Sequence, residues 1–253
     1  MILNIPDRQL DSRIYRVLTL ERLLEMFATN NNVLVKPELW EDTFENFILR
    51  SEVKSSSGQK YKYNLHEEMY GQCWTKESSS DAMWRIYSPN KDGLRIRTTI
   101  RKLIESMHSA HPAHPETMCC IGRVEYLNDK NLMERANSTF EKSGISVENL
   151  FRSLLVKRRA FRHENEVRIL FHNYRGDNHP SKTYSYPVDP GGLIDQIMID
   201  PRRTFSEFET IKRIIRHTTD YKKSIKRSLL YALPKKTVIE VKNDSNIYDV
   251  FNT

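Results

Sequence analysis

Two glutamates, Glu164 and Glu166, lie within the basic segment KRRAFRHENEVRILF, residues 157–171. Paired carboxylates flanked by arginines suit the stabilisation of a cationic or oxocarbenium-like transition state, because the arginines keep the carboxylates ionised. Here the flanking arginines are Arg162 and Arg168. The same pattern also arises in a cross-strand ladder of ion pairs on a solvated face, which contributes little energy. The residues alone leave both interpretations open.

The end of this segment, HENEVRILF, alternates in the manner of a β-strand, in which successive side chains point to opposite faces. The expected core face consists of Val167, Ile169 and Phe171. The other face consists of Glu164, Glu166 and Arg168. Neighbours on one face of a strand are about 6.6 Å apart, so the two carboxylates are expected side by side on this strand.

Aromatic residues and arginines are interleaved in the segment AMWRIYSPNKDGLRIR, residues 82–97. Trp84 and Tyr87 are three positions apart and share one face of an expected helix, near Arg85 and Arg95. Such aromatic rings can stack on a base or a nicotinamide ring while the cations hold phosphate. Aromatic residues at helical spacing more commonly pack in a core, so for any single ring packing is the simpler interpretation.

Histidines and cysteines are concentrated in HSAHPAHPETMCC, at positions 108, 111, 114, 119 and 120. Zinc sites favour two pairs of closely spaced ligands, and this alternation of histidine and proline lacks that spacing. No metal site is expected. Cys119 and Cys120 are expected to point to opposite faces of an apolar strand and to pack as small hydrophobic side chains.

Composition indicates a folded protein of 253 residues with 38% apolar residues and a formal net charge of +7. This basic excess favours polyanionic partners. Three cysteines are too few for a disulfide framework, which favours a reducing compartment. Neither a signal peptide nor an apolar run near 18 residues is present, so a cytoplasmic protein without a membrane span is expected. The sequence also lacks a Walker loop, a G-x-G-x-x-G motif and a G-x-S-x-G motif, which disfavours P-loop NTPases, standard Rossmann dehydrogenases and serine hydrolases.

Short strands and helices alternate along the chain without repeats or low-complexity linkers, which predicts one α+β domain over residues 1–253. Expected strands lie in 13–19, 33–40, 71–76, 92–99, 119–127, 166–173, 191–200, 224–230 and 237–242. Expected helices lie in 20–29, 78–88, 100–109, 129–142, 146–160 and 204–218, and residues 51–62 are expected to form a loop.

Five segments, taken in order, resemble a widespread bacterial and phage family of unknown function. They are IYRVLTLERLLEMF, LVKPELWEDTFE, CWTKESSSDAMWRIYSPNKDGLRI, FRHENEVRIL and IDQIMIDPRRTFSEFETIKRII. The resemblance covers most of the chain, from about residue 13 to 230. Members of that family carry a Tyr-Arg strand, an Asn/Asp-Pro-Phe-Glu turn, a Met-Trp-x-x-Tyr helix and a Glu-x-Glu-x-Arg strand. The chain departs from the pattern at Thr43, which replaces the usual proline of the turn.

The layout of this family is similar to the ADP-ribosyltransferase fold, which implies a mixed, split β-sheet flanked by helices and NAD as the ADP-ribose donor. The resemblance implies that Glu166 is the catalytic glutamate and that Glu164 is the first acid of the Glu-x-Glu pair. It also implies that the Tyr-Arg strand, Tyr15 and Arg16, contacts NAD. The implied neighbours of the nicotinamide are Tyr87 and Trp84.

The function expected from these observations is NAD-dependent ADP-ribosyl transfer by a toxin or an anti-phage defence effector, without a metal. Basic segments favour a nucleic acid as the acceptor, RNA over DNA or protein, and a cognate antitoxin is an expected partner. Candidate substrate contacts are Arg85, Arg95, Arg162 and Arg168. Two alternatives stay open: a metal-dependent nuclease, with Arg168 where such enzymes usually have lysine, and a non-catalytic RNA-binding or antitoxin-like module.

Overall fold

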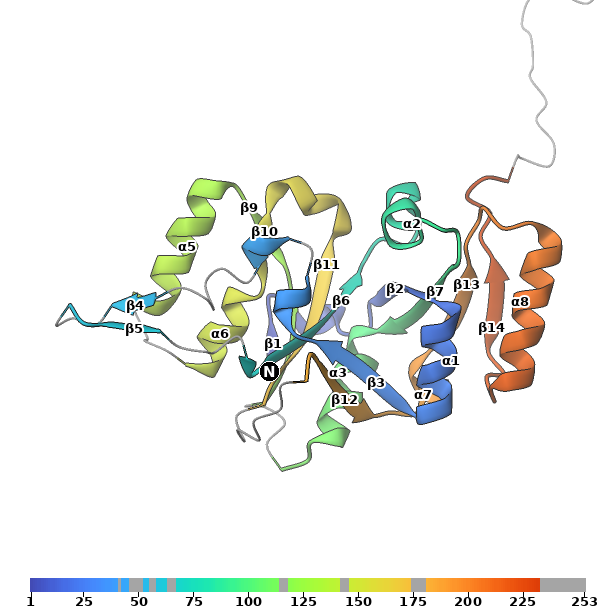
Figure 1. Cartoon of the computed structure of the whole chain (residues 1–253), viewed down its shortest axis with the longest axis horizontal. Coiled ribbons are helices and arrows are strands. Elements are labelled where there is room, and N and C mark those ends of the chain that lie inside the picture. The colour runs from blue at the N-terminus through green and yellow to red at the C-terminus, as the bar shows by residue number, and fades with distance from the viewer. Residues whose placement is uncertain are drawn as a thin grey trace, which may run out of the picture.

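The computed structural model describes residues 1–40, 42–45, 52–54, 58–62, 67–113, 118–141, 146–173 and 181–232. A large mixed sheet flanked by helices runs through this part of the chain (Figure 1), which confirms the α+β class predicted from the sequence. The expected strand at 237–242 and the histidine at position 114 lie outside the described residues.

The strands are β1 (Ile2–Leu3), β2 (Arg13–Thr19), β3 (Asn31–Val35), β4 (Glu52–Lys54), β5 (Lys60–Lys62), β6 (Met69–Thr75), β7 (Gly93–Thr99), β8 (Cys119–Arg123), β9 (Glu125–Leu127), β10 (Val156–Arg158), β11 (Glu166–His172), β12 (Thr183–Pro187), β13 (Gln196–Ile199) and β14 (Ser224–Arg227). The α-helices are α1 (Leu20–Thr29), α2 (Asp81–Tyr87), α3 (Ile100–Ala110), α5 (Asp129–Glu141), α6 (Val147–Ser153), α7 (Pro190–Leu193) and α8 (Phe205–Thr218). The 3-10 helices are η1 (Asp7–Gln9), η2 (Pro37–Leu39), η3 (Thr43–Glu45) and η6 (Arg159–Glu164).

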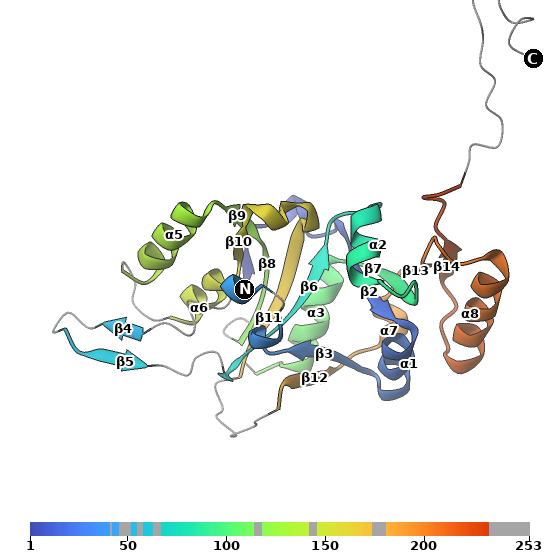
Figure 2. The ribbon, with the colours of Figure 1, turned by 45° about the horizontal axis from the view of Figure 1, so that its top comes forward.

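The main sheet has the order β1-β8-β11-β6-β2-β7-β13-β14, and β3 joins β6 as a branch that also carries β12. Its β1–β8 and β13–β14 pairs are parallel, and its other pairs are antiparallel. Figures 1 and 2 place α8 near β14 at one end of the sheet and α5 beside β9 and β10 at the other.

The sheet splits at β6, because two strands compete for the same edge of β6. Strand β2 pairs with β6 through Tyr15 and Thr75, whereas β3 pairs with β6 through Val35 and Gly71. Residues 72–74 of β6 therefore lie between the diverging strands β2 and β3. This divergence opens the space in which the cavity described below is found.

Apolar residues cover both faces of the sheet, in two clusters. The larger cluster contains Ile169 and Cys119 together with residues of α1, α3 and α8, and the smaller one contains Leu170 and Cys120 with residues of α6. Strand alternation explains this arrangement, because successive residues of β8 and of β11 point to opposite faces. The prediction that the two adjacent cysteines pack on opposite faces is confirmed.

Helix starts follow from capping residues that the sequence displays. Thr19, Ser80 and Thr99 each accept a hydrogen bond from a backbone N–H in the first turn of α1, α2 and α3. Thr204 and Glu207 form a complete capping box at the start of α8. The helices α1, α3 and α8 begin within one residue of the predicted position, whereas α2 begins at Asp81, three residues after the predicted start.

Three expectations about local structure are wrong. The expected loop 51–62 contains the strands β4 and β5, which pair with each other. The helix expected over 146–160 ends at Ser153, because the chain turns into the buried strand β10. The strand expected over 191–200 begins only at Gln196, and residues 190–193 form the short helix α7. The strand β12, which pairs with β3, was not predicted.

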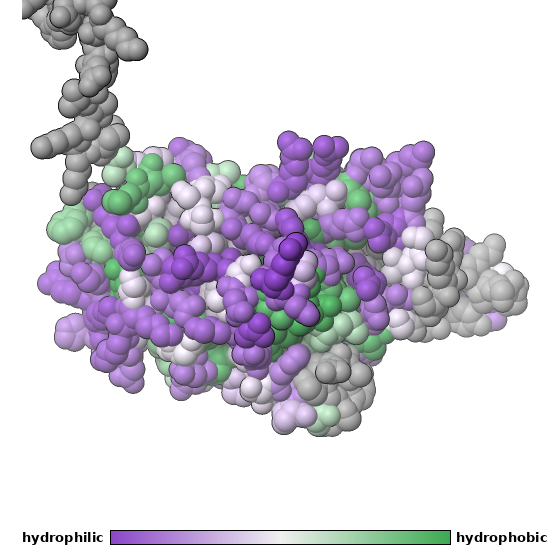
Figure 3. Space-filling view, turned by 180° about the vertical axis from the view of Figure 1, so that it is seen from behind, coloured by the Kyte–Doolittle hydropathy of each residue, from purple (hydrophilic) through white to green (hydrophobic). Residues whose placement is uncertain are grey.

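The surface is predominantly hydrophilic on the face turned away from the viewer of Figure 1, with smaller apolar patches between the polar side chains (Figure 3). Across the described residues, we found no helix with the length and apolar character that crossing a membrane requires.

Candidate active site

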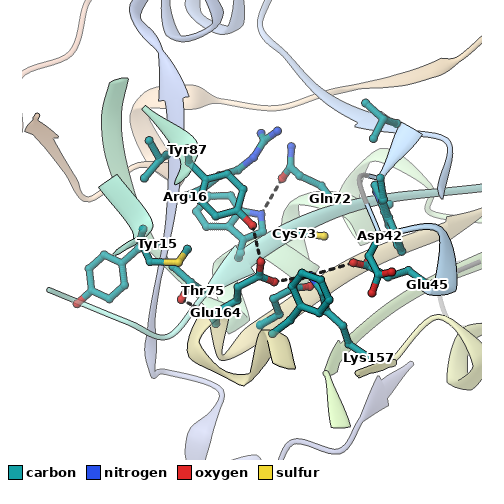
Figure 4. A pocket seen from close by; sticks show the side chains of 18 of the residues that line it. Tyr15, Arg16, Asp42, Glu45, Gln72, Cys73, Thr75, Tyr87, Lys157 and Glu164 are labelled. Atoms are coloured by element: carbon teal, nitrogen blue, oxygen red, sulfur yellow. Dashed lines mark hydrogen bonds and ion pairs between the residues drawn. The ribbon is translucent and has the colours of Figure 1, made fainter. Parts of the chain in front are cut away.

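A cavity of about 280 Å³ lies where the sheet splits, between β2, β3 and β6. Both glutamates of the Glu-x-Glu segment line it, together with Arg16 and Tyr87 (Figure 4). These four residues come from β11, η6, β2 and α2, so the fold brings together side chains that are up to 150 positions apart in the chain. The fold thus brings four of the candidate residues to one cavity.

Glu166 is the first residue of β11, and its side chain is only 4% exposed. One carboxylate oxygen accepts a hydrogen bond from Lys157 Nζ at 2.7 Å, and the other accepts one from Arg168 Nε at 2.6 Å. Its backbone N–H donates to the hydroxyl of Tyr126 at 2.9 Å. Burial disfavours the carboxylate, but Arg168 and Lys157 outweigh burial and lower the pKa of Glu166 below its usual value.

Glu164 does not lie on the strand that the sequence predicts, which corrects the expected spacing of the pair. It ends η6, and Asn165 then adopts a left-handed conformation with φ 44° before β11 begins. Asparagine tolerates this conformation better than most residues do. The backbone carbonyl of Glu164 accepts a hydrogen bond from Thr75 Oγ1 at 2.5 Å, which ties this turn to β6.

The side chain of Glu164 is buried between a cation and a phenol. Lys157 Nζ donates to Oε2, and the hydroxyl of Tyr87 donates to Oε1 at 3.1 Å. Burial, together with the hydrogen bond to Glu166 and its charge, raises the pKa of Glu164 to about 8. Two neighbouring carboxyl groups whose pKa values are pushed apart can act in different protonation states at neutral pH.

Sequence reasoning missed two charged residues of this site. Lys157 on β10 is buried and also bonds Glu45 of η3 at 2.9 Å, and Glu45 accepts a hydrogen bond from Arg168 Nη2 at 2.5 Å. Both residues lie in segments that the sequence marks, the basic run at 157 and the acidic turn at 41–45. Neither pattern indicates that their side chains meet the glutamate pair, because that contact depends on tertiary structure.

Arg16 contributes a guanidinium group to the cavity from the centre of β2. Among the residues that the structure describes, no acidic side chain pairs with it. Burial in these surroundings lowers the pKa of Arg16 to about 10, so the group is a cation at neutral pH. A half-buried cation without an acidic partner is suited to holding an anionic ligand such as a phosphate.

The aromatic residues expected at the site differ in their placement. Tyr87 lines the cavity while 42% of its surface stays exposed, which places it at the entrance. Trp84 is 2% exposed and does not line the cavity, so its expected contact with the cofactor is wrong: the ring is buried on the core side of α2. Tyr15 lines the cavity, but its ring points away from Glu164 (Figure 4) and lies 4.6 Å from the guanidinium of Arg95.

The four arginines expected to contact a substrate occupy different environments. Arg168 is completely buried against Glu45, Glu166 and the ring of Trp40, so it supports the site from beneath and cannot reach a substrate. Arg95 is also buried and donates to the carbonyl of Ser78, away from the cavity. These two expectations are therefore wrong.

Arg85 and Arg162 are exposed on the surface. Arg85 forms an ion pair with Asp81 one helical turn away, at 2.7 Å. Arg162 lies on η6, two residues before Glu164. Of the four candidate arginines, it is the one that is exposed to solvent and also close in the chain to the two glutamates. Within the described ranges, no group of three or more His, Cys, Asp and Glu side chains is arranged to hold a metal ion.

Comparison with curated protein sequences found no match. Solved structures of DarT from Thermus sp. 2.9 align with the chain at low identity. The complex with NAD+ is 11% identical with a TM-score of 0.39, and the alignment covers 89% of this chain and 98% of that one. The complex with ADP-ribosylated ssDNA is 12% identical with a TM-score of 0.40, covering 90% of this chain and 97% of that one. From the Met-Trp-x-x-Tyr helix to the Glu-x-Glu-x-Arg strand, residues 83–169, the chain matches the family model of proteins of unknown function called DUF2971.

Proposed function

We propose that the protein is an NAD-dependent ADP-ribosyltransferase. The observation that carries this proposal is one cavity that contains an ionised carboxylate, Glu166, a second carboxyl group, Glu164, and the guanidinium of Arg16. Transfer of ADP-ribose needs these three kinds of group. One carboxylate stabilises the developing cation, the second carboxyl group accepts the proton of the acceptor, and the guanidinium binds the pyrophosphate of the donor.

The reaction breaks the bond between C1′ of the ribose and the nicotinamide nitrogen, and the bonding electron pair leaves with neutral nicotinamide. The ribose then carries an oxocarbenium charge, which the carboxylate of Glu166 stabilises. Lys157 and Arg168 hold this carboxylate in one orientation, so little reorganisation is needed when the charge develops. The acceptor attacks C1′, and its proton passes to the carboxylate form of Glu164.

Arg16 and Tyr87 would position the donor. A cavity of about 280 Å³ is small for a whole dinucleotide, so the nicotinamide and its ribose would enter while the adenosine half stays outside. Arg16 would then meet the pyrophosphate at the edge of the cavity. The ring of Tyr87 at the entrance would cover the nicotinamide, and its hydroxyl already contacts Glu164.

We further propose a nucleic acid as the acceptor, with RNA as the first choice and DNA as the alternative. Arg159 and Arg162 are exposed on η6, immediately before Glu164, where cationic side chains could contact backbone phosphates. The net charge of +7 favours the same class of partner. A cytoplasmic toxin or defence effector of this kind would need a neutralising antitoxin in its own cell.

Incubation with NAD labelled on its adenylate phosphate tests the proposal. The purified protein receives labelled NAD and, in separate reactions, RNA, single-stranded DNA or a protein extract, and released nicotinamide is measured in each. We expect transfer of label to one nucleic acid, and a loss of at least about 100-fold in Glu166→Gln. The same substitution at Glu25, which is exposed on α1 and distant from the cavity, is the control and should leave turnover unchanged.

Absence of both label transfer and nicotinamide release, in every reaction, would contradict the proposal. Cleavage of RNA or DNA that requires magnesium and not NAD would instead support the nuclease alternative. Binding of nucleic acid that is insensitive to Glu164→Gln and Glu166→Gln together, without turnover, would support the non-catalytic module.

A further inference from the structure

Five buried charged groups form one connected cluster at the wall of the cavity, and four of them line it. We call it the carboxylate cluster, and it consists of Glu45, Lys157, Glu164, Glu166 and Arg168. Each of these side chains is at most 6% exposed. Buried charges are costly unless they are paired and hydrogen-bonded, so the internal balance of the cluster decides its protonation.

Lys157 is the centre of the carboxylate cluster, because its ammonium group contacts all three carboxylates. Nζ lies 2.9 Å from Glu45 and 2.7 Å from Glu166, and it also donates to Glu164. An ammonium group has three donors, so these contacts use its full donor capacity. The ring of Phe161 lies 4.7 Å from Nζ and limits the access of solvent to this ammonium group.

The charges of the carboxylate cluster do not cancel when every group is ionised, because three carboxylates face two cations. Arg168 bonds Glu45 and Glu166 but not Glu164. Glu164 therefore depends on Lys157 and on the neutral hydroxyl of Tyr87. Closely spaced buried carboxylates share protons, and the carboxylate with the fewest cationic partners retains the proton.

The other titratable groups near the cluster add no positive charge next to Glu164. They are Tyr87 on α2, Tyr126 on β9 and Cys73 on β6, and burial raises the pKa of each. These groups stay neutral at physiological pH. The next cations are Arg16, which faces the cavity, and Arg158, which pairs with Asp42 at 2.8 Å.

We propose that Lys157 is a positioning residue that fixes the three carboxylates relative to one another. The carboxylate cluster then carries a single proton, on Glu164, at neutral pH. This inference rests on the proposed function only where it concerns turnover, since Glu164 must lose that proton before it can accept one from the acceptor. Transfer of ADP-ribose therefore rises with pH and reaches half of its plateau near pH 8.

Removal of the ammonium group should shift this pH profile. In Lys157→Met, Glu164 loses its cationic partner, so the profile moves to higher pH by about 1–3 pH units. In Lys157→Arg the charge is retained, so the pH midpoint stays close to that of the wild type while kcat falls because the geometry differs. Lys130, which is 84% exposed on α5, offers a matched control, and Lys130→Met should change neither quantity.

Carbon NMR tests the inference without any need for turnover. The wild type, Glu164→Gln, Lys157→Met and Lys157→Arg are labelled with ¹³C at the glutamate side-chain carboxyl and titrated from pH 5 to about 10. We expect one carboxyl resonance with a midpoint near pH 8, absent from Glu164→Gln and displaced upwards in Lys157→Met. If Lys157→Met does not fold, Lys157→Arg and Glu164→Gln still decide whether the proton is on Glu164.

Two results would overturn the inference: a wild type in which every glutamate titrates below about pH 6, or a high midpoint that survives in Glu164→Gln. An unchanged titration midpoint of Glu164 in folded Lys157→Met would contradict the positioning role of Lys157. A protein that never turns over NAD but shows the expected titration would contradict the proposed function and leave the inference about Glu164 intact. Failure of the proposed function and failure of this inference are therefore distinguishable.

Discussion

Replacement of Arg16 by methionine should abolish NAD binding and at the same time stabilise the fold. Arg16 presents a half-buried cation to the cavity, and within the described part of the chain it has no acidic partner. A functional group that is held in this way lowers stability, because its dehydration is not compensated until a ligand arrives. Methionine has a similar length and no charge, so Arg16→Met removes the cost without opening a large void.

The size of the expected gain in stability follows from the pKa of Arg16, which burial lowers from 12.5 to about 10. One pKa unit corresponds to about 1.4 kcal/mol, so full dehydration of the cation would cost about 3.4 kcal/mol. The side chain keeps partial contact with solvent in the cavity, so about half of that value, roughly 1–2 kcal/mol, is the expected gain in the free energy of unfolding. A folded-state pKa below the unfolded one penalises folding at every pH below 10, so the gain should be constant between pH 6 and about 9.

Urea unfolding followed by circular dichroism measures the free energy of unfolding, and a thermal shift with and without NAD measures binding. Wild-type protein should gain stability as NAD is added, whereas Arg16→Met should start higher and gain nothing. Arg85→Met is the control, since Arg85 forms an exposed ion pair and its loss should change stability by no more than about 0.5 kcal/mol. An Arg16→Met protein that is less stable than the wild type, or that still responds to NAD, would refute the reasoning.

Two further substitutions test the packing and the protonation of the site. Between about pH 4.5 and 8 the folded protein should hold one more proton on Glu164 than the unfolded chain does. This contribution to stability is therefore complete below pH 4.5 and is lost as pH rises to about 8, by up to about 1.4 kcal/mol per pH unit. Urea titrations at several pH values should show this fall in the free energy of unfolding in the wild type and a smaller fall in Glu164→Gln. Gly71→Ala should lower the free energy of unfolding by about 1–3 kcal/mol, because a Cβ atom would lie 2.7 Å from the Trp40 ring and 2.9 Å from Leu170; unchanged stability in the same urea assay would contradict the packing at the split of the sheet.

Local patterns were sufficient to predict most helices and strands, because their signals lie within a few residues. The apolar alternation of Val167, Ile169 and Phe171 predicted β11, and the caps at Thr19 and Thr204 predicted where α1 and α8 begin. The strand β10 escaped prediction, since three residues are too few to show a period. The pairing of β12 with β3 depends on a partner about 150 positions away, which no local pattern contains.

The candidate site was predictable only in part, for a related reason. Glu164, Glu166, Arg16 and Tyr87 were identified through family motifs, and they do line one cavity. Motif spacing did not reveal that Glu164 lies on a turn, because the strand pattern extends across Asn165 without a break in polarity. Trp84 was misplaced since ring type alone does not distinguish the core side of a helix from its cavity side.

Two departures from ordinary folding rules lie at the cavity, and they support the assignment of the site. Arg16 lacks an acidic partner among the described residues, and three carboxylates that line the cavity share two cations. Each feature costs free energy that a purely structural role would not require. Natural sequences agree with their fold at most positions and depart from such rules mainly at functional or strained sites. If the carboxylate cluster were only a structural ion-pair network, apolar residues of similar volume at Lys157, Glu164 and Glu166 would stabilise the fold without loss of any activity.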